Sequence, residues 1–255
     1  MSLILTLLLA ACGTEEPAAL TCAEGELLDG ERCVPEACGI GTWGNLQTDE
    51  VTVYVDASAE AGGDGSKESP FTIIQEGIDA QDQRAMVAVA AGTYQENVQI
   101  TGDHAGVHLA GRCRELVTID ASAGEELVDE AGSGINVVTT GLADSWAVSG
   151  LTTSGAPWSG IHHVQGTLVL DRVASVGNRY CGLLTGYGTL VASDFTARDN
   201  MDVGLFVVGS AATRRRDITV VRSLYRFLRE RGMVDSDRSS LLRVPLLNNR
   251  NPRPV

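Results

Sequence analysis

Short runs in which apolar and polar side chains alternate occupy most of the chain between residues 51 and 122. A period of two places successive side chains on opposite faces of an extended strand, so these runs predict half-buried β-strands. Gly, Asp and Asn separate the runs, as is typical of tight turns. The predicted strands lie within residues 51–59, 86–94, 97–100, 106–111 and 116–122.

One stretch in this region has a helical period instead. Ser69 is a favourable N-cap residue and Pro70 suits the first helical position, so the sequence predicts a short helix that begins there. In such a helix Phe71, Ile74 and Ile78 share one face. We expect this amphipathic helix to cover an open end of the β-structure and to protect it from edge-to-edge association.

A longer period governs the second half of the chain. Three segments, beginning at Gly160, Gly182 and Gly204, are each 22 residues long, and each opens with Gly followed by Ile or Leu. In this register Asn178 falls on Asn200. A unit of this size cannot bury its own hydrophobic face, but stacked units can, because each strand pairs with its equivalent in the next coil.

The repeat, which runs from about residue 146 to residue 213, predicts an all-β fold. A loose coil of about 22 residues with irregular turns indicates a right-handed parallel β-helix, with about six or seven coils over residues 49–221. The composition agrees with a β-rich chain of many tight turns, because Gly is abundant (29 residues) and aromatic residues make up only 5%.

Two stretches resemble the opening of a known family. "VYVDASAEAGGDGSKESPFTIIQEGID" and "VAVAAGTYQENVQI" are similar to the start of right-handed parallel β-helix proteins of the pectin-lyase-like superfamily. The resemblance implies the same solenoid fold and a short capping helix. Some members of this superfamily cleave polysaccharides, but a shared fold does not specify a reaction.

The first residues predict export. "MSLILTLLLAAC" is a short apolar run that ends in small residues, which favours a signal peptide over residues 1–11. Its last four residues resemble the lipobox of bacterial lipoproteins, and the resemblance implies cleavage before Cys12 and a lipid on that cysteine. The run has no Lys or Arg, so we expect the true start upstream. Residues 12–21 form a polar tether, and we expect anchoring in the cell envelope, at the outer membrane.

A cysteine-rich segment follows over residues 22–48. It is too small to fold around a hydrophobic core of its own, so we expect disulfides to stabilise it in an oxidising compartment. Zinc is the alternative, but there is no CxxC motif and no nearby His. This leader resembles those of lipoprotein families in gliding, predatory soil bacteria. The disulfide candidates are Cys22, Cys33, Cys38 and Cys113, and Cys181 is the expected free thiol.

Charge divides the chain into an acidic body and a basic tail. The net charge is −14, yet residues 214–255 carry 11 Arg against four acidic residues. The acidic body argues against nucleic acid as a partner. Residues 222–255 lack the repeat, so they are either a capping helix or the product of a reading frame lost near residues 213–225; we favour the second. An open solenoid end predicts marginal stability or association.

Candidate chemistry is sparse, and no residue stands out as catalytic. Asp194, Asp199 and Asp202 could hold Ca²⁺, and His163 is the remaining metal-ligand candidate. The simpler interpretation is that Asp and Asn occupy the tight corners of a β-helix. In a catalytic set, Asp171 could add a further carboxylate, and Arg172 and Arg198 could serve as bases.

The adjacent histidines are interpreted through the repeat. His162 aligns with Leu184 and Phe206, which favours a packed or hydrogen-bonded side chain over a ligand. Neighbouring residues in a strand face opposite sides, so His162 and His163 cannot easily bind one metal ion together.

Taken together, these features favour a non-enzymatic envelope lipoprotein. We expect a surface or periplasmic scaffold or binding module with a polysaccharide or cell-surface partner. The N-terminal lipid is expected to anchor the protein in the membrane. The alternative is a carbohydrate-active lyase or hydrolase of the pectin-lyase-like superfamily that has lost part of its site. No cofactor is expected, apart from the Ca²⁺ alternative.

Overall fold

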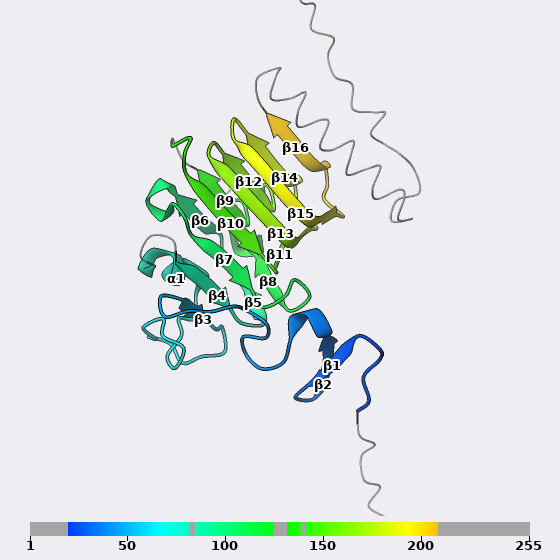
Figure 1. The fold of residues 1–255 in the computed structure, drawn as a ribbon. Helices are drawn as coiled ribbons and strands as arrows, with labels where there is room; N and C mark the ends of the chain where they lie inside the picture. The colour runs from blue at the N-terminus through cyan, green and yellow to red at the C-terminus, as the bar shows by residue number, and fades with distance from the viewer. Residues whose placement is uncertain (1–19, 82–84, 125–131, 139–140, 209–255) are drawn as a thin grey trace, which may run out of the picture.

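The chain forms a parallel β-solenoid, as seen in a computed structural model (Figure 1). The structure describes residues 20–81, 85–124, 132–138 and 141–208. The predictions for the signal peptide, Cys12, and the tail over residues 222–255 lie outside these residues. Within the described part of the chain, no helix is long and apolar enough to cross a membrane.

All strand pairs of the solenoid are parallel, as the 22-residue repeat predicts. β13 (Thr167–Val176) and β15 (Thr189–Arg198) are long strands that bend at Arg172 and Asp194, both in the left-handed region. The first half of β13 pairs with β10 (Ser145–Ser149) and the second half with β11 (Thr152–Ser154), so one nine-stranded sheet supplies two faces. A separate sheet of five strands supplies the third.

The strands follow one another around these faces. They are β3 (Val53–Val55), β4 (Met86–Val89), β5 (Gly92–Tyr94), β6 (Val98–Thr101), β7 (His108–Gly111), β8 (Val117–Asp120), β9 (Ile135–Val138), β10 (Ser145–Ser149), β11 (Thr152–Ser154), β12 (Ile161–Val164), β13 (Thr167–Val176), β14 (Cys181–Gly186), β15 (Thr189–Arg198) and β16 (Val203–Val208). Two 3-10 turns, η2 (Gly102–His104) and η3 (Ala121–Gly124), lie between them.

The 22-residue register is confirmed in the second half of the solenoid. Thr167 pairs with Thr189, and Ile161 pairs with Leu183. The described residues form about five turns, counted from the five-stranded sheet, which has one strand per turn. The six or seven coils were expected over residues 49–221, of which residues 209–221 lie outside the described part of the chain. The earlier coils are longer: equivalent side chains lie 26 and 37 residues apart, since loops are inserted there.

Inward-facing side chains of all three faces build one continuous core. Large residues such as Trp146, Leu168, Leu170 and Ile161 are almost completely buried. Burial of this kind stabilises each coil only through its neighbours, because the apolar side chains stack from one coil onto the next.

Asparagines at equivalent positions of successive coils form a short ladder of hydrogen bonds at one turn of the stack. Asn178 is completely buried. Its backbone N–H and its Nδ2 both donate to Oδ1 of Asn200, at 3.0 and 2.8 Å. The Oδ1 of Asn178 in turn accepts from the N–H of Ala156 at 3.1 Å, so the amide satisfies backbone groups that the turn would otherwise leave unpaired.

The predicted helix exists but begins later than expected. α1 runs over Ile74–Ala80, next to β3 and β4 (Figure 1), and Ser69 does not cap it. Instead the Glu96 carboxylate, 22 residues downstream, accepts the N–H of Ile74 and of Gln75 at 2.8 and 2.9 Å. This distant carboxylate accepts the first N–H groups of the helix as an N-cap side chain would, and a local sequence pattern cannot predict such a contact. Ile74 and Ile78 are completely buried, as expected, whereas Phe71 lies before the helix and forms a β-bridge with Val55.

Candidate functional site

The cysteine-rich leader docks on one corner of the solenoid. It consists of an antiparallel hairpin, β1 (Glu26–Asp29) and β2 (Arg32–Pro35), followed by the 3-10 turn η1 (Glu36–Cys38). Figure 1 shows it below the solenoid, near β5 and β8.

A buried arginine of the solenoid fixes the leader. Arg112, only 5% exposed, donates from Nη2 to the Asp29 carboxylate at 2.7 Å and to the Gly39 carbonyl at 2.5 Å. Its Nε donates to the Cys38 carbonyl at 3.2 Å. The pKa of Asp29 is lowered, first by the hydrogen bond from the Gly41 N–H and then by Arg112. A buried guanidinium with this set of acceptors specifies one docking geometry.

The cysteine-rich segment forms two disulfides, as expected, and one of them joins it to the solenoid. Cys22 is bonded to Cys33 within the leader, and Cys38 is bonded to Cys113 of the solenoid. The second bond joins residues 75 positions apart. In the chain-entropy model such a loop contributes about 4 kcal/mol, against about 3 kcal/mol for the first. Cys181 is a free, buried thiol, and burial raises its pKa to about 11.

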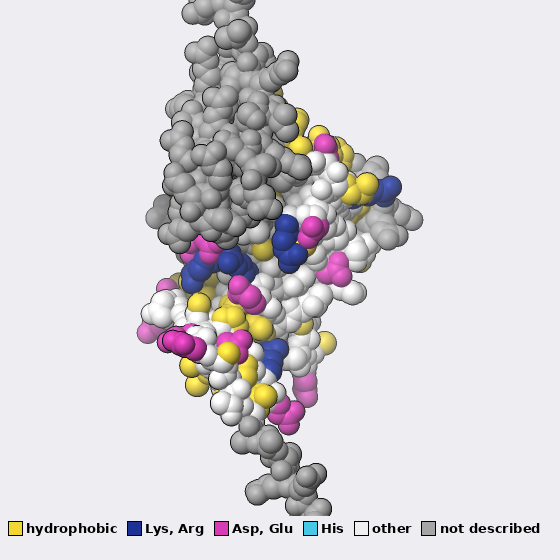
Figure 2. All heavy atoms as spheres, turned by 90° about the vertical axis from the view of Figure 1, so that its right-hand side faces the viewer, with side chains coloured by type: hydrophobic (Ala, Val, Ile, Leu, Met, Phe, Trp, Pro, Cys, Tyr) yellow, Lys and Arg dark blue, Asp and Glu magenta, His cyan; other side chains and the backbone are white. Residues whose placement is uncertain are grey.

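A polar groove of about 150 Å³ lies where the leader meets the solenoid. Its leader side is formed by Ala37, Asn45 and Leu46. The solenoid side is formed by Gly111, Arg112, Cys113, Arg114, Glu115, Ser149, Gly150, Arg172 and Asp194. On this side of the molecule basic side chains lie directly beside acidic ones (Figure 2).

Two partly exposed arginines line the groove, and each is paired with an acidic side chain. Arg114 donates to Asp194 at 2.9 Å and to Glu115 at 3.1 Å, and its side chain remains 28% exposed. Arg172 donates to Asp171 at 3.0 Å and is 56% exposed. Burial acts to lower the pKa of Arg114, but the hydrogen bonds that it donates to Asp194 and Glu115, together with their negative charges, outweigh burial and raise the pKa. Arg114 therefore stays protonated, which suits anion binding and not proton abstraction.

A serine and a histidine that the sequence analysis did not single out meet at this groove. Ser149 lines it, and its Oγ lies 2.8 Å from Nε2 of His108 on the neighbouring strand. Burial lowers the pKa of His108, although the nearby Asp171 carboxylate opposes that effect. His108 and Ser149 are separated by a coil longer than 22 residues, so the 22-residue repeat does not align their strands. The one sequence feature that could align the two strands is the glycine at the end of each, Gly111 and Gly150.

The proposed calcium ligands do not converge. Asp194 lies at the groove, whereas Asp199 pairs with its neighbour Arg198 in the turn that precedes β16. Asp194 and Asp199 both have positive φ, which agrees with the interpretation of these residues as corner residues.

One cluster in the described part of the chain has suitable metal-ligand spacing. It is formed by Cys38, Cys113 and Glu115, whose ligand atoms lie within 4.8 Å of one another. Because the two cysteines are joined in a disulfide, they offer no thiolate to a metal ion.

The two histidines face opposite sides of β12, as strand geometry requires. His163 faces the core: it is completely buried, pairs in register with Val137 and Thr185, and its Nδ1 lies 2.9 Å from the Thr185 hydroxyl. Its Nε2 has no partner, and burial lowers its pKa to about 4. His162 is on the outer side, with Nδ1 2.8 Å from Oδ1 of Asn136. Neither side chain is placed to bind a metal from solvent.

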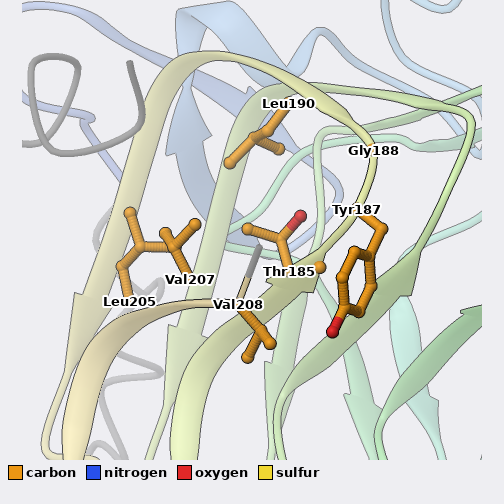
Figure 3. A pocket seen from close by; sticks show the side chains of 8 residues that line it. Thr185, Tyr187, Gly188, Leu190, Leu205, Val207 and Val208 are labelled. Carbon is orange, nitrogen blue, oxygen red and sulfur yellow. The ribbon is translucent and has the colours of Figure 1, made fainter. Parts of the chain in front are cut away.

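A second, smaller cavity lies at the last described coil (Figure 3). Leu190, Leu205 and Val207 line it with Thr185 and Tyr187, and its volume of about 20 Å³ suffices for roughly one water molecule. Its apolar lining marks the end of the described stack and not a ligand site.

Comparison of the chain with protein-family models, curated proteins and solved structures gives no significant match.

The buried imidazole of His163 makes stability depend on pH. Its folded pKa of about 4 lies below the ordinary value of 6.5, so the unfolded chain takes up this proton first as the pH falls. The free energy of unfolding is therefore expected to drop between pH 6.5 and 4, by up to about 3 kcal/mol from this group. Replacing His163 with Leu removes this share of the pH dependence, as measured by urea unfolding over the same range.

Thr185→Val is the matched control, because it deletes the hydroxyl partner and keeps the titrating ring. It should retain the loss of stability on the acid side. An identical pH dependence for the wild type and His163→Leu would contradict the burial of a neutral ring.

Proposed function

We propose that this protein is an exported, lipid-anchored module whose β-solenoid serves as a binding scaffold for an acidic glycan. The leader supports export, because two disulfides in one small segment and its junction are typical of oxidising compartments. The apolar start and its lipobox-like end at Cys12 support the anchor in the cell envelope, at the outer membrane. The resemblance to the pectin-lyase-like superfamily supports a glycan as the ligand.

The observation that carries the binding role is the groove between leader and solenoid. In a chain of net charge −14 it gathers the guanidinium groups of Arg114 and Arg172, both accessible to solvent. Planar guanidinium groups bind carboxylates and sulfates through paired N–H donors. The disulfide and Arg112 hold the groove walls in place, so little ordering entropy opposes binding.

Among the described residues, the geometry does not favour the alternative of a polysaccharide lyase or hydrolase of this superfamily. Such a hydrolase needs two carboxylates across one bond, and such a lyase needs a cation-binding acid cluster with a basic residue. Asp171 and Asp194 are each paired with an arginine, and Arg114 is held in its protonated form. A binding scaffold fits these paired charges better.

The lipid anchor is tested at Cys12. Cells that express the full chain with its own signal peptide (residues 1–11) should incorporate labelled palmitate into the protein, and the protein should be recovered with the membranes. Cys12→Ala should abolish the label and release the protein to the soluble fraction, because no other thiol receives the lipid. Cys181→Ala is the control and should keep the label. Equal labelling of the wild type and Cys12→Ala would overturn the anchor.

The binding role is tested at Arg172. Titration calorimetry should show that an oligogalacturonate binds, whereas a neutral xylo-oligosaccharide of the same length does not. Arg172→Gln should weaken binding about tenfold, since a hydrogen bond between charged groups is lost. Arg198→Gln is the matched control, because Arg198 is similarly exposed (65% against 56% for Arg172) and pairs with its neighbour Asp199, away from the groove. Equal loss in both variants would reduce the effect to net charge.

A further inference from the structure

The outer face of the solenoid brings one hydroxyl and one imidazole together. On β10 the side chains of Trp146 and Val148 point into the core, so Ser149 points outward. On β7 Leu109 is in the core, so His108 points outward as well. His108 pairs in register with Ala147, two residues before Ser149, which places the two side chains diagonally across neighbouring strands.

The contact between them has the geometry of a nucleophile and its base. His108 Nε2 and Ser149 Oγ are 2.8 Å apart. In the tautomer that carries its proton on Nδ1, the ring accepts the serine proton. A serine hydroxyl is a weak nucleophile by itself and becomes effective when a neighbouring imidazole can take that proton. Burial favours the neutral, proton-accepting ring of His108.

The pair lies where a substrate can reach it. Ser149 lines the groove between leader and solenoid although only 8% of it is exposed, so access to its hydroxyl is through the groove. Arg114 and Arg172 line the same groove, each paired with an acidic side chain. A volume of about 150 Å³ accommodates a short acyl group.

We propose that Ser149 and His108 hydrolyse a small acyl ester in this groove, an activity beyond the binding role above. Ser149 Oγ attacks the ester carbonyl while His108 Nε2 takes its proton. The tetrahedral oxyanion collapses, the C–O bond to the alcohol breaks, and His108 returns the proton to the departing alcohol. Water then attacks the acyl-serine with His108 as base, so that a carboxylic acid leaves and Ser149 is restored. Ester and water are consumed, and acid and alcohol are formed.

Ser193 on a neighbouring strand is a control that distinguishes a reactive Ser149 from an ordinary surface serine. Ser193 pairs with Asp171, which pairs with Ser149, so both serines occupy the same column of the same outer face. Ser193 belongs to β15 and is exposed, but it does not line the groove. If surface serines of this sheet reacted unspecifically, Ser193 would be the more accessible of the two.

The test is hydrolysis of p-nitrophenyl acetate by the purified protein, with no glycan present. Ser149→Ala and His108→Gln should each lower kcat/KM by about 100-fold, the usual contribution of a positioned acid–base partner. Ser193→Ala should keep the wild-type rate. A fluorophosphonate should form a bond to Ser149 Oγ with loss of fluoride, which mass spectrometry locates on the peptide that contains Ser149.

Wild-type rates in Ser149→Ala, or labelling of Ser193 in place of Ser149, would overturn the proposal. If a variant fails to fold, as judged by its thermal unfolding, the labelling of the wild-type protein still decides. Absence of label on Ser149 then overturns it. Because no glycan is used, a protein that binds no oligogalacturonate can still pass this test, and a glycan-binding protein can fail it.

Discussion

In-register stacking of one coil on the next is the constraint on which the rest of this structure depends. Each strand satisfies its backbone hydrogen bonds with the equivalent strand one coil away, and the same translation places Leu on Leu and Asn on Asn. No coil has a core of its own, so stability is shared along the stack and falls at its ends. Corners obey the same rule, which is why Arg172 and Asp194 share a left-handed conformation at equivalent positions.

The leader turns this regular stack into a molecule with one distinctive place. Without it, the corner near Arg112 would be another turn of the solenoid. The disulfide between Cys38 and Cys113 and the buried Arg112 hold the leader there, and the groove exists only because these two parts meet. Binding and chemistry can then depend on a geometry that the repeat alone does not create.

The sequence was most informative where the structure is periodic. The strands, the 22-residue register and the Asn178–Asn200 pair follow from local alternation and from one translation. The start of α1 was mistaken because its cap, Glu96, comes from a different coil. Inserted loops lengthen some of the early coils, and a single 22-residue period does not predict them.

Most of the groove could not be foreseen for a similar reason. Asp194 was among the candidate residues, but its partner Arg114 lies 80 residues earlier in the sequence. Ser149 and His108 were missed because the coil that separates them departs from the repeat. His163 was a metal-ligand candidate, but strand alternation places its side chain in the core.

The central claim, that equivalent residues of successive coils stabilise one another directly, is tested by a double-mutant cycle on Asn178 and Asn200. Urea unfolding of the wild type, Asn178→Ala, Asn200→Ala and the double variant gives the coupling free energy. Stacking in this register predicts a coupling of about 0.5–3 kcal/mol, since the two amides are in direct contact. Strictly additive effects of the two substitutions would contradict it.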